Sequence, residues 1–137
     1  MIIDIHSHFY PDSISDMETR FGGGIWPGFR KISDQKGMIT LEGEDYRPIY
    51  DACWNPARRI EELDKYGVDI QIMCATPILF AYEKPARESL ACARVMNDEA
   101  LIMCDHNPAR LKAMCQVPLQ DIDLACEEVS RAMDRGH

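Results

Sequence analysis

The feature that most constrains the fold is an alternation of strand-like and helix-like segments along the chain. Apolar or alternating side chains predict strands at residues 2–8, 68–75 and 111–117. A helix-like pattern follows each of these strands in turn, at residues 55–67, 85–107 and 121–136. This order predicts parallel strands joined by right-handed crossovers, and hence an α/β fold of about three strand–helix units.

Residue types at the segment ends support the predicted helices. Asn55 and Pro56 are typical of a helix start, and Gly67 is typical of a helix end. In this first helix we expect Arg58 and Arg59 to lie on a solvated face beside neighbouring glutamates. In the third helix we expect five apolar side chains to face inward: Ile122, Ala125, Val129, Ala132 and Met133.

Residues 12–55 separate the first strand from the first helix and show no regular period. Clusters of glycine and proline at residues 22–24 and 26–28 predict loops and short hairpins there. Loops of this length usually cover a site or carry binding groups. We therefore expect an insertion over about residues 12–55 within a single domain of residues 1–137, with Trp54 packed beneath it.

Composition excludes several classes of function. The chain has 137 residues and is 46% hydrophobic, which suits one domain with a real core. Its 15 basic and 23 acidic residues give a net charge of −8, so we expect no nucleic-acid partner. No apolar stretch approaches the roughly 20 residues of a membrane span, and no signal peptide opens the chain. These features predict a cytoplasmic protein that does not bind membranes.

The cysteines support the same location. There are six, and no two of them form a Cys-x-x-Cys pair. Most lie inside apolar segments, which is typical of reduced, buried thiols rather than of a disulfide framework or a zinc knuckle.

Two histidines at the end of the first strand are the strongest candidates for a site. Alternate side chains of a strand share a face, so we expect Asp4, His6 and His8 to point the same way. Two imidazoles on one face can ligate zinc or another divalent metal. Partly exposed histidines satisfied by water or backbone are the alternative. The position of the two histidines directly after a buried strand favours the metal site. We expect Asp4 to form hydrogen bonds near the metal rather than to ligate it.

Several stretches of the sequence together resemble one enzyme family. They are similar, in register over essentially the whole chain, to the metal-dependent decarboxylase branch of the amidohydrolase superfamily. The matching stretches are residues 4–8, 20–22, 46–48, 53–56, 59–64, 67–69, 75–77 and 116–121.

The resemblance implies a fold and a site. The fold would be a (β/α)8 TIM-type barrel with a small insertion after the first strand, and zinc would be bound by His6 and His8 at the carboxyl ends of the strands. Arg47 would bind the substrate carboxylate, because a guanidinium matches a carboxylate in bidentate fashion. Judged from the residues alone, the better interpretation of Arg47 is an ordinary surface arginine paired with Glu44 or Asp45.

The activity implied is zinc-dependent, non-oxidative decarboxylation of a small unsaturated or aromatic carboxylic acid by a homodimer of full-length chains. Because such a barrel needs about 250 residues, we expect this chain to be its N-terminal part. The resemblance places the other metal ligands and the acid–base histidine beyond His137, so no catalytic residue is assigned here. A metal-dependent hydrolase of the same superfamily and a noncatalytic metal-binding or interaction fragment are the alternatives.

Overall fold

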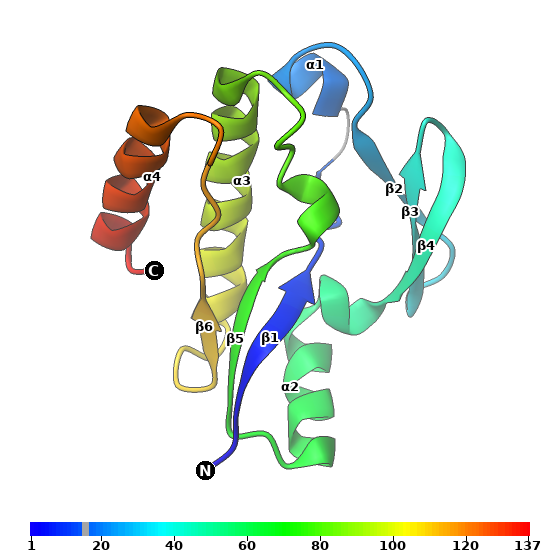
Figure 1. Ribbon diagram of the computed structural model, residues 1–137. Helices are drawn as coiled ribbons and strands as arrows, with labels where there is room; N and C mark the ends of the chain where they lie inside the picture. Colours follow the sequence, from blue (N-terminus) through cyan, green and yellow to red (C-terminus); the bar gives the residue numbers. More distant parts are fainter. Residues whose placement is uncertain (15–16) are drawn as a thin grey trace.

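A parallel sheet forms the centre of the molecule in the computed structural model, which describes residues 1–14 and 17–137. Its strands, in spatial order, are β1 (Ile3–Phe9), β5 (Ile70–Ala75) and β6 (Leu111–Ala113), and both pairings are parallel. The strands are followed by α2 (Pro56–Tyr66), α3 (Ala86–Asp105) and α4 (Ile122–Arg135), respectively. Helix α3 crosses behind the sheet and α4 packs beside α3 (Figure 1). The predicted alternation and the α/β class are confirmed.

The ends of α2 and α4 show why these helices begin and stop where the sequence predicts. The Asn55 side chain accepts hydrogen bonds from the backbone N–H groups of Ala57 and Arg58, and Gly67 ends α2 in the left-handed conformation, at φ 67°. Asp121 caps α4 in the same way by accepting from the backbone of Leu124. No helix in the described part of the chain is long and apolar enough to cross a membrane.

The predicted insertion folds as a small unit of its own beside the parallel sheet (Figure 1). It contains α1 (Met17–Phe21) and an antiparallel sheet of β2 (Pro27–Lys31), β3 (Lys36–Leu41) and β4 (Glu44–Tyr50). The short 3-10 helix η1 (Asp51–Cys53) leads from this sheet to α2.

Aromatic packing joins the insertion to the rest of the protein. The Trp54 ring packs edge-on against Phe29 of β2, with ring centroids 5.3 Å apart, so the predicted place of Trp54 beneath the insertion is confirmed. Gly37 of β3 is required at this contact, because a Cβ atom there would lie 2.2 Å from the Phe29 ring. The insertion is therefore fixed against the segment that begins α2.

Helix α4 departs from the predicted orientation. Ala125 and Ala132 are buried, but Ile122 is 77% exposed, Met133 58% and Val129 41%. The prediction that these three side chains face inward is therefore wrong. A helical period alone does not say which face of a helix packs, and the face that packs here carries Glu128, which is fully buried.

A polar cluster around Glu128 joins α4 to α3. The Glu128 carboxylate accepts hydrogen bonds from Asn97 at 2.7 Å, from Arg131 at 2.8 Å and from Arg94 at 3.2 Å. Burial by itself favours the neutral acid, but the hydrogen bonds from Arg131 and Asn97 outweigh it and hold the pKa of Glu128 below its ordinary value. Because these partners hydrogen-bond the buried Glu128 carboxylate, it can take a position between α3 and α4 where an apolar side chain would ordinarily pack.

All six cysteines are free. Cys92 and Cys104 are buried, whereas Cys126 is exposed, so the expectation of buried thiols fails for that residue on the solvent side of α4. Burial raises the pKa of Cys92 to about 12 and that of Cys104 to about 11. Both thiols are therefore protonated at neutral pH and unreactive.

Candidate metal centre

The two histidines of β1 lie together near the carboxyl end of the strand. Their ring centroids are 5.2 Å apart and the ring planes meet at 85°. His6 is exposed and His8 is half-buried, so a ligand can reach both rings. The predicted proximity of the two imidazoles is thus present in the structure.

The contacts of His8 indicate which of its nitrogens is available. Nδ1 lies 3.2 Å from the carbonyl oxygen of Ala75 at the end of β5. A carbonyl can only accept, so this contact places the proton on Nδ1 and leaves the lone pair of Nε2 free. Histidines that bind metals are commonly held in this way, by a second hydrogen bond that fixes the tautomer and orients the ring. His8 therefore has the arrangement that a metal ligand needs.

Cys74 is the other group beside His8, with Sγ 3.3 Å from Nδ1. Burial raises the pKa of the Cys74 thiol, which keeps it protonated. Its Sγ lies beside Nδ1 of His8, whereas the lone pair available to a metal is on Nε2 of that ring, so the position of Cys74 does not favour it as a ligand of the same metal.

Asp4 lies on a different face from the one predicted. The pairing of β1 with β5 shifts register between Asp4 and Ser7, so that Asp4 pairs with Gln71 and His8 pairs with Cys74. Gln71 and Cys74 are three positions apart on a strand of alternating burial, and they therefore face opposite sides of the sheet. The expectation that Asp4, His6 and His8 share one face is wrong for Asp4, because the bulge inverts the alternation.

Asp4 instead hydrogen-bonds to the backbone of β1 and to a side chain of β5. Its Oδ1 accepts a hydrogen bond from the backbone N–H of His6 at 3.0 Å, and its Oδ2 accepts from Nε2 of Gln71 at 2.7 Å. The hydrogen bond from Gln71, with that from His6, lowers the pKa of Asp4 despite partial burial. The carboxylate is therefore ionised at neutral pH and is already engaged, which suits a supporting group better than a metal ligand.

Arg59 of α2 is the residue that sequence reasoning placed wrongly. It is 6% exposed rather than solvated, and burial lowers the pKa of its guanidinium. Nη1 donates to Oε1 of Gln71 and Nη2 donates to the carbonyl of His8, both at 2.7 Å. One signal pointed to this position, because Arg59 lies four residues before the buried Leu63 and so falls on the apolar face of α2.

Two imidazoles are only part of a metal site. Across residues 1–14 and 17–137, no three His, Cys, Asp or Glu side chains are grouped so that they could hold a metal ion. The free Nε2 of His8 and the neighbouring His6 ring fit zinc in donor type, whereas a catalytic zinc takes about three protein ligands. The described residues thus fit the metal as a partial ligand set.

Arg47 lies on β4, where it pairs with Ile39 of β3, and its side chain is exposed. It makes no hydrogen bond or ion pair with any described residue. Asp45, which the alternative interpretation offered as its partner, forms an ion pair with Arg30 instead. The guanidinium of Arg47 therefore remains open to a ligand.

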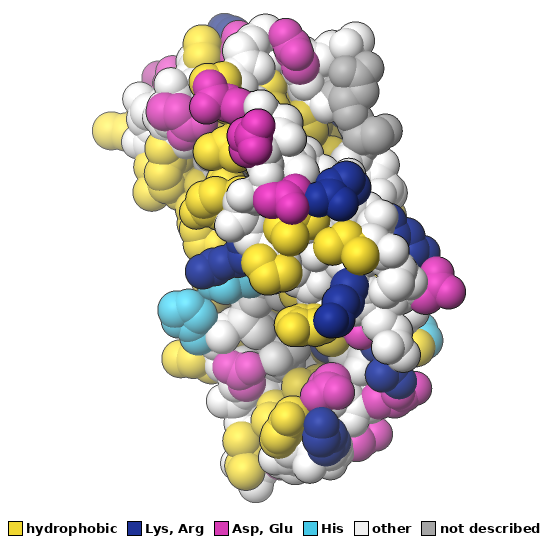
Figure 2. All heavy atoms as spheres, turned by 90° about the vertical axis from the view of Figure 1, so that its right-hand side faces the viewer, with side chains coloured by type: hydrophobic (Ala, Val, Ile, Leu, Met, Phe, Trp, Pro, Cys, Tyr) yellow, Lys and Arg dark blue, Asp and Glu magenta, His cyan; other side chains and the backbone are white. Residues whose placement is uncertain are grey.

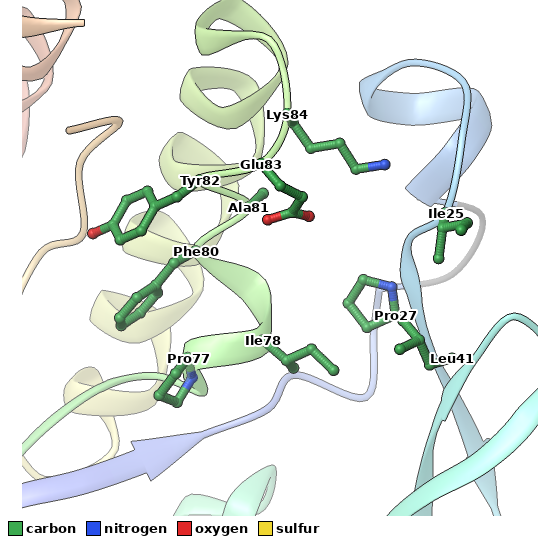
Figure 3. A pocket seen from close by; sticks show the side chains of 10 residues that line it. All are labelled: Ile25, Pro27, Leu41, Pro77, Ile78, Phe80, Ala81, Tyr82, Glu83 and Lys84. Atoms are coloured by element: carbon green, nitrogen blue, oxygen red, sulfur yellow. The ribbon is translucent and has the colours of Figure 1, made fainter. Parts of the chain in front are cut away.

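A pocket of about 620 Å³ opens between the insertion and the segment that follows β5 (Figure 3). Ile25, Pro27 and Leu41 form the wall on the insertion side, and Pro77, Ile78 and residues 80–84 form the other. Pro77 is two residues beyond Ala75, whose carbonyl contacts His8, so the pocket lies past the histidine end of the parallel strands. Its walls are largely apolar, with Glu83 and Lys84 the charged exceptions.

The surface on the side of the insertion carries mixed charge. Figure 2 shows lysine and arginine side chains dispersed there among acidic and apolar ones, with histidine side chains reaching the surface. No basic patch for a polyanion forms on the face shown, in keeping with the net charge of −8.

Comparison with known proteins finds similar solved structures and similar curated proteins. No family model matches the chain. A crystal structure of 2,6-dihydroxybenzoate decarboxylase, complexed with 2,6-dihydroxybenzoate, is 30% identical with a TM-score of 0.52, covering 56% of this chain and 24% of that one. The apo structure of Metarhizium anisopliae IDCase, 18% identical, has the same fold with a TM-score of 0.68, covering 95% of this chain and 38% of that one.

Two curated proteins of one name align with nearly the whole chain. The chain is 28% identical over 131 residues to 2-amino-3-carboxymuconate-6-semialdehyde decarboxylase of Dictyostelium discoideum, covering 96% of this chain and 36% of the relative. It is also 28% identical over 128 residues to the Caenorhabditis elegans protein of the same name, covering 91% and 31%. The predicted resemblance to amidohydrolase-superfamily decarboxylases is confirmed. The chain spans about a third of the length of these curated relatives.

Proposed function

We propose that this chain is the N-terminal part of a zinc-dependent, non-oxidative decarboxylase, with the fold of a (β/α)8 barrel. Its substrate would be a small unsaturated or aromatic carboxylic acid such as 2-amino-3-carboxymuconate 6-semialdehyde. The observation that carries the proposal is the histidine pair at the end of β1, with Nδ1 of His8 held by a carbonyl and Nε2 left free. The similarity to curated decarboxylases supports the reaction class.

The chain supplies groups for binding such a substrate. Decarboxylation breaks a carbon–carbon bond, releases carbon dioxide and leaves an electron pair that the conjugated system must accept. Arg47, whose guanidinium has no described partner, would hold a substrate carboxylate in bidentate fashion. The apolar walls of the pocket beside Ile78 and Pro27 would contact the conjugated body (Figure 3). When bound, zinc supplies Lewis-acid chemistry.

The metal assignment is tested by replacing His6. In the full-length protein, His6→Ala removes one of two adjacent imidazoles, so we expect bound zinc, measured by elemental analysis, to fall sharply and turnover to be lost. The matched control is His106→Ala, because His106 lies exposed at the far end of α3 and should leave both quantities unchanged. Unchanged zinc and turnover in His6→Ala would contradict the assignment.

A direct assay of the reaction products separates the alternatives. A hydrolase of the same superfamily would use the same imidazole pair, so His6→Ala would also lower its zinc content. Release of carbon dioxide from a candidate acid, measured directly, identifies a decarboxylase, whereas water uptake without carbon dioxide identifies a hydrolase. Zinc binding with neither reaction would identify a noncatalytic metal-binding protein.

A further inference from the structure

We propose that Arg59, Gln71 and Asp4 are positioning residues whose hydrogen bonds fix the main chain at His6 and His8. In doing so they would set how the two imidazoles meet one metal ion. This inference rests on the proposed metal site and assigns a role to three residues that would not themselves bind the metal. We refer to these three side chains as the Arg59–Gln71–Asp4 network.

The network joins the backbones of the two histidines through three side chains. It begins at the carbonyl of His8, which accepts from Nη2 of Arg59, and continues from Nη1 of Arg59 to Oε1 of Gln71. Nε2 of Gln71 then donates to Asp4, whose second oxygen accepts from the backbone N–H of His6. The first three of these bonds measure 2.7 Å each and the last bond measures 3.0 Å.

The direction of every bond in the network is determined by Arg59. A guanidinium has no acceptor, so it must face the oxygen of the Gln71 amide. The amide nitrogen of Gln71 is then turned toward Asp4, where an ionised carboxylate can only accept. The four bonds of the network therefore have a single arrangement, in which each joins a donor to an acceptor, while Nε of Arg59 is buried without a partner among the described residues.

The network lies where the sheet itself does not support the histidines. The register of β1 against β5 shifts between Asp4 and Ser7, which interrupts the ladder of backbone hydrogen bonds at His6. The His6 N–H bonds to Asp4 instead. Three polar side chains thus supply a support that a regular strand would receive from its neighbour. That support acts on the two residues with adjacent imidazoles.

A reversal of bond polarity tests the network. Asp4→Asn places an amide donor against either the Gln71 donor or the His6 N–H, and Gln71→Glu places two carboxylates together, so each single variant breaks one bond of the network. In the double variant, the new amide at position 4 would donate to the new carboxylate at position 71. The amide oxygen at position 4 would still accept from His6, and the carboxylate at position 71 would still accept from Arg59. The double variant therefore restores every bond without changing net charge.

The measurements are made on the full-length protein with Co2+ and Zn2+. Affinity comes from competition with a chelator, and ligand geometry from the visible absorption bands of bound Co2+. We expect each single variant to weaken metal binding about 10- to 100-fold and to shift the Co2+ bands. The double variant should recover the parent spectrum and most of the affinity. Thermal unfolding is followed in parallel for all variants.

Glu128→Gln is the matched control, because it perturbs a buried hydrogen-bonded carboxylate between α3 and α4 that does not touch β1. It should lower thermal stability but leave the Co2+ spectrum unchanged. The inference is overturned if the single variants keep the parent affinity and spectrum, or if the double variant binds no better than the weaker single one. If His6→Ala binds metal as tightly as the parent does, the proposed metal site itself fails, and the inference fails with it.

Discussion

Arg47 is the residue that we propose to bind the substrate carboxylate. It lies exposed on the edge strand β4 with no described partner, and nothing in the packing requires a cation there. If it binds the substrate carboxylate, Arg47→Ala in the full-length enzyme should cost about 2–5 kcal/mol of transition-state stabilisation. We expect kcat/KM to fall roughly tens- to thousands-fold, with zinc content and folding intact.

Two further variants sharpen this test. Arg47→Lys should recover only part of the lost kcat/KM, because an ammonium cannot reproduce two parallel hydrogen bonds. Arg30→Ala is the control, since Arg30 lies on the same antiparallel sheet but pairs with Asp45. Near-normal kcat/KM in Arg47→Ala would make Arg47 a surface charge without a catalytic role.

At the scale of the element, the packing of α4 against α3 depends on the negative charge of Glu128. The folded protein holds the pKa of Glu128 below its ordinary value of 4.5, so the unfolded chain takes up the proton first as the pH falls. The contribution of Glu128 to stability is therefore complete above about pH 4.5 and is lost as the pH falls through the folded pKa. Glu128→Gln should lower the free energy of unfolding at pH 7 by about 1–3 kcal/mol.

Urea unfolding of the two proteins at pH 7 and pH 3 checks this expectation. The difference between parent and Glu128→Gln should be largest at pH 7 and smaller at pH 3, because pH 3 lies below the ordinary pKa of 4.5 and protonation of the unfolded parent chain has by then removed part of the stability that the charge contributes. Glu127→Gln serves as the control, because Glu127 is 57% exposed and its ion pair with Arg94 contributes little. A difference that is equal at both pH values would show that the charge of Glu128 is unimportant.

At the scale of the whole molecule, much apolar surface is uncovered. Ile5 on β1 is 68% exposed, Leu119 is 65% exposed and Ile122 on α4 is 77% exposed. Both β1 and β6 are edge strands of the parallel sheet. Exposed apolar patches and open strand edges favour association.

We therefore expect the 137-residue chain, expressed alone, to self-associate through its exposed apolar surface. It should bind a hydrophobic dye and elute from a sizing column as an aggregate or a larger assembly. The full-length protein, measured beside it, should bind less dye because a completed barrel would cover these surfaces. A clean monomer that unfolds in one sharp transition would show that residues 1–137 are sufficient as a unit.

The local structure of this protein followed from its sequence. Asn55 and Gly67 marked the two ends of α2, and alternating apolar residues identified β5, because caps and periodicity act between residues close in the chain. The neighbouring positions of His6 and His8 were also evident, since a strand holds such residues near each other. The resemblance to decarboxylases came from stretches spread over the whole chain.

Only the tertiary structure decided how these elements face one another. Arg59 and Glu128 are charged residues that the helical pattern assigned to solvent or left unassigned, yet both are buried where partners from other elements satisfy them. The register shift in β1 turned Asp4 away from the histidine face. Register and charge pairing depend on residues distant in the chain, so a local pattern such as the apolar face of α2 could indicate that Arg59 is buried but could not identify its partners.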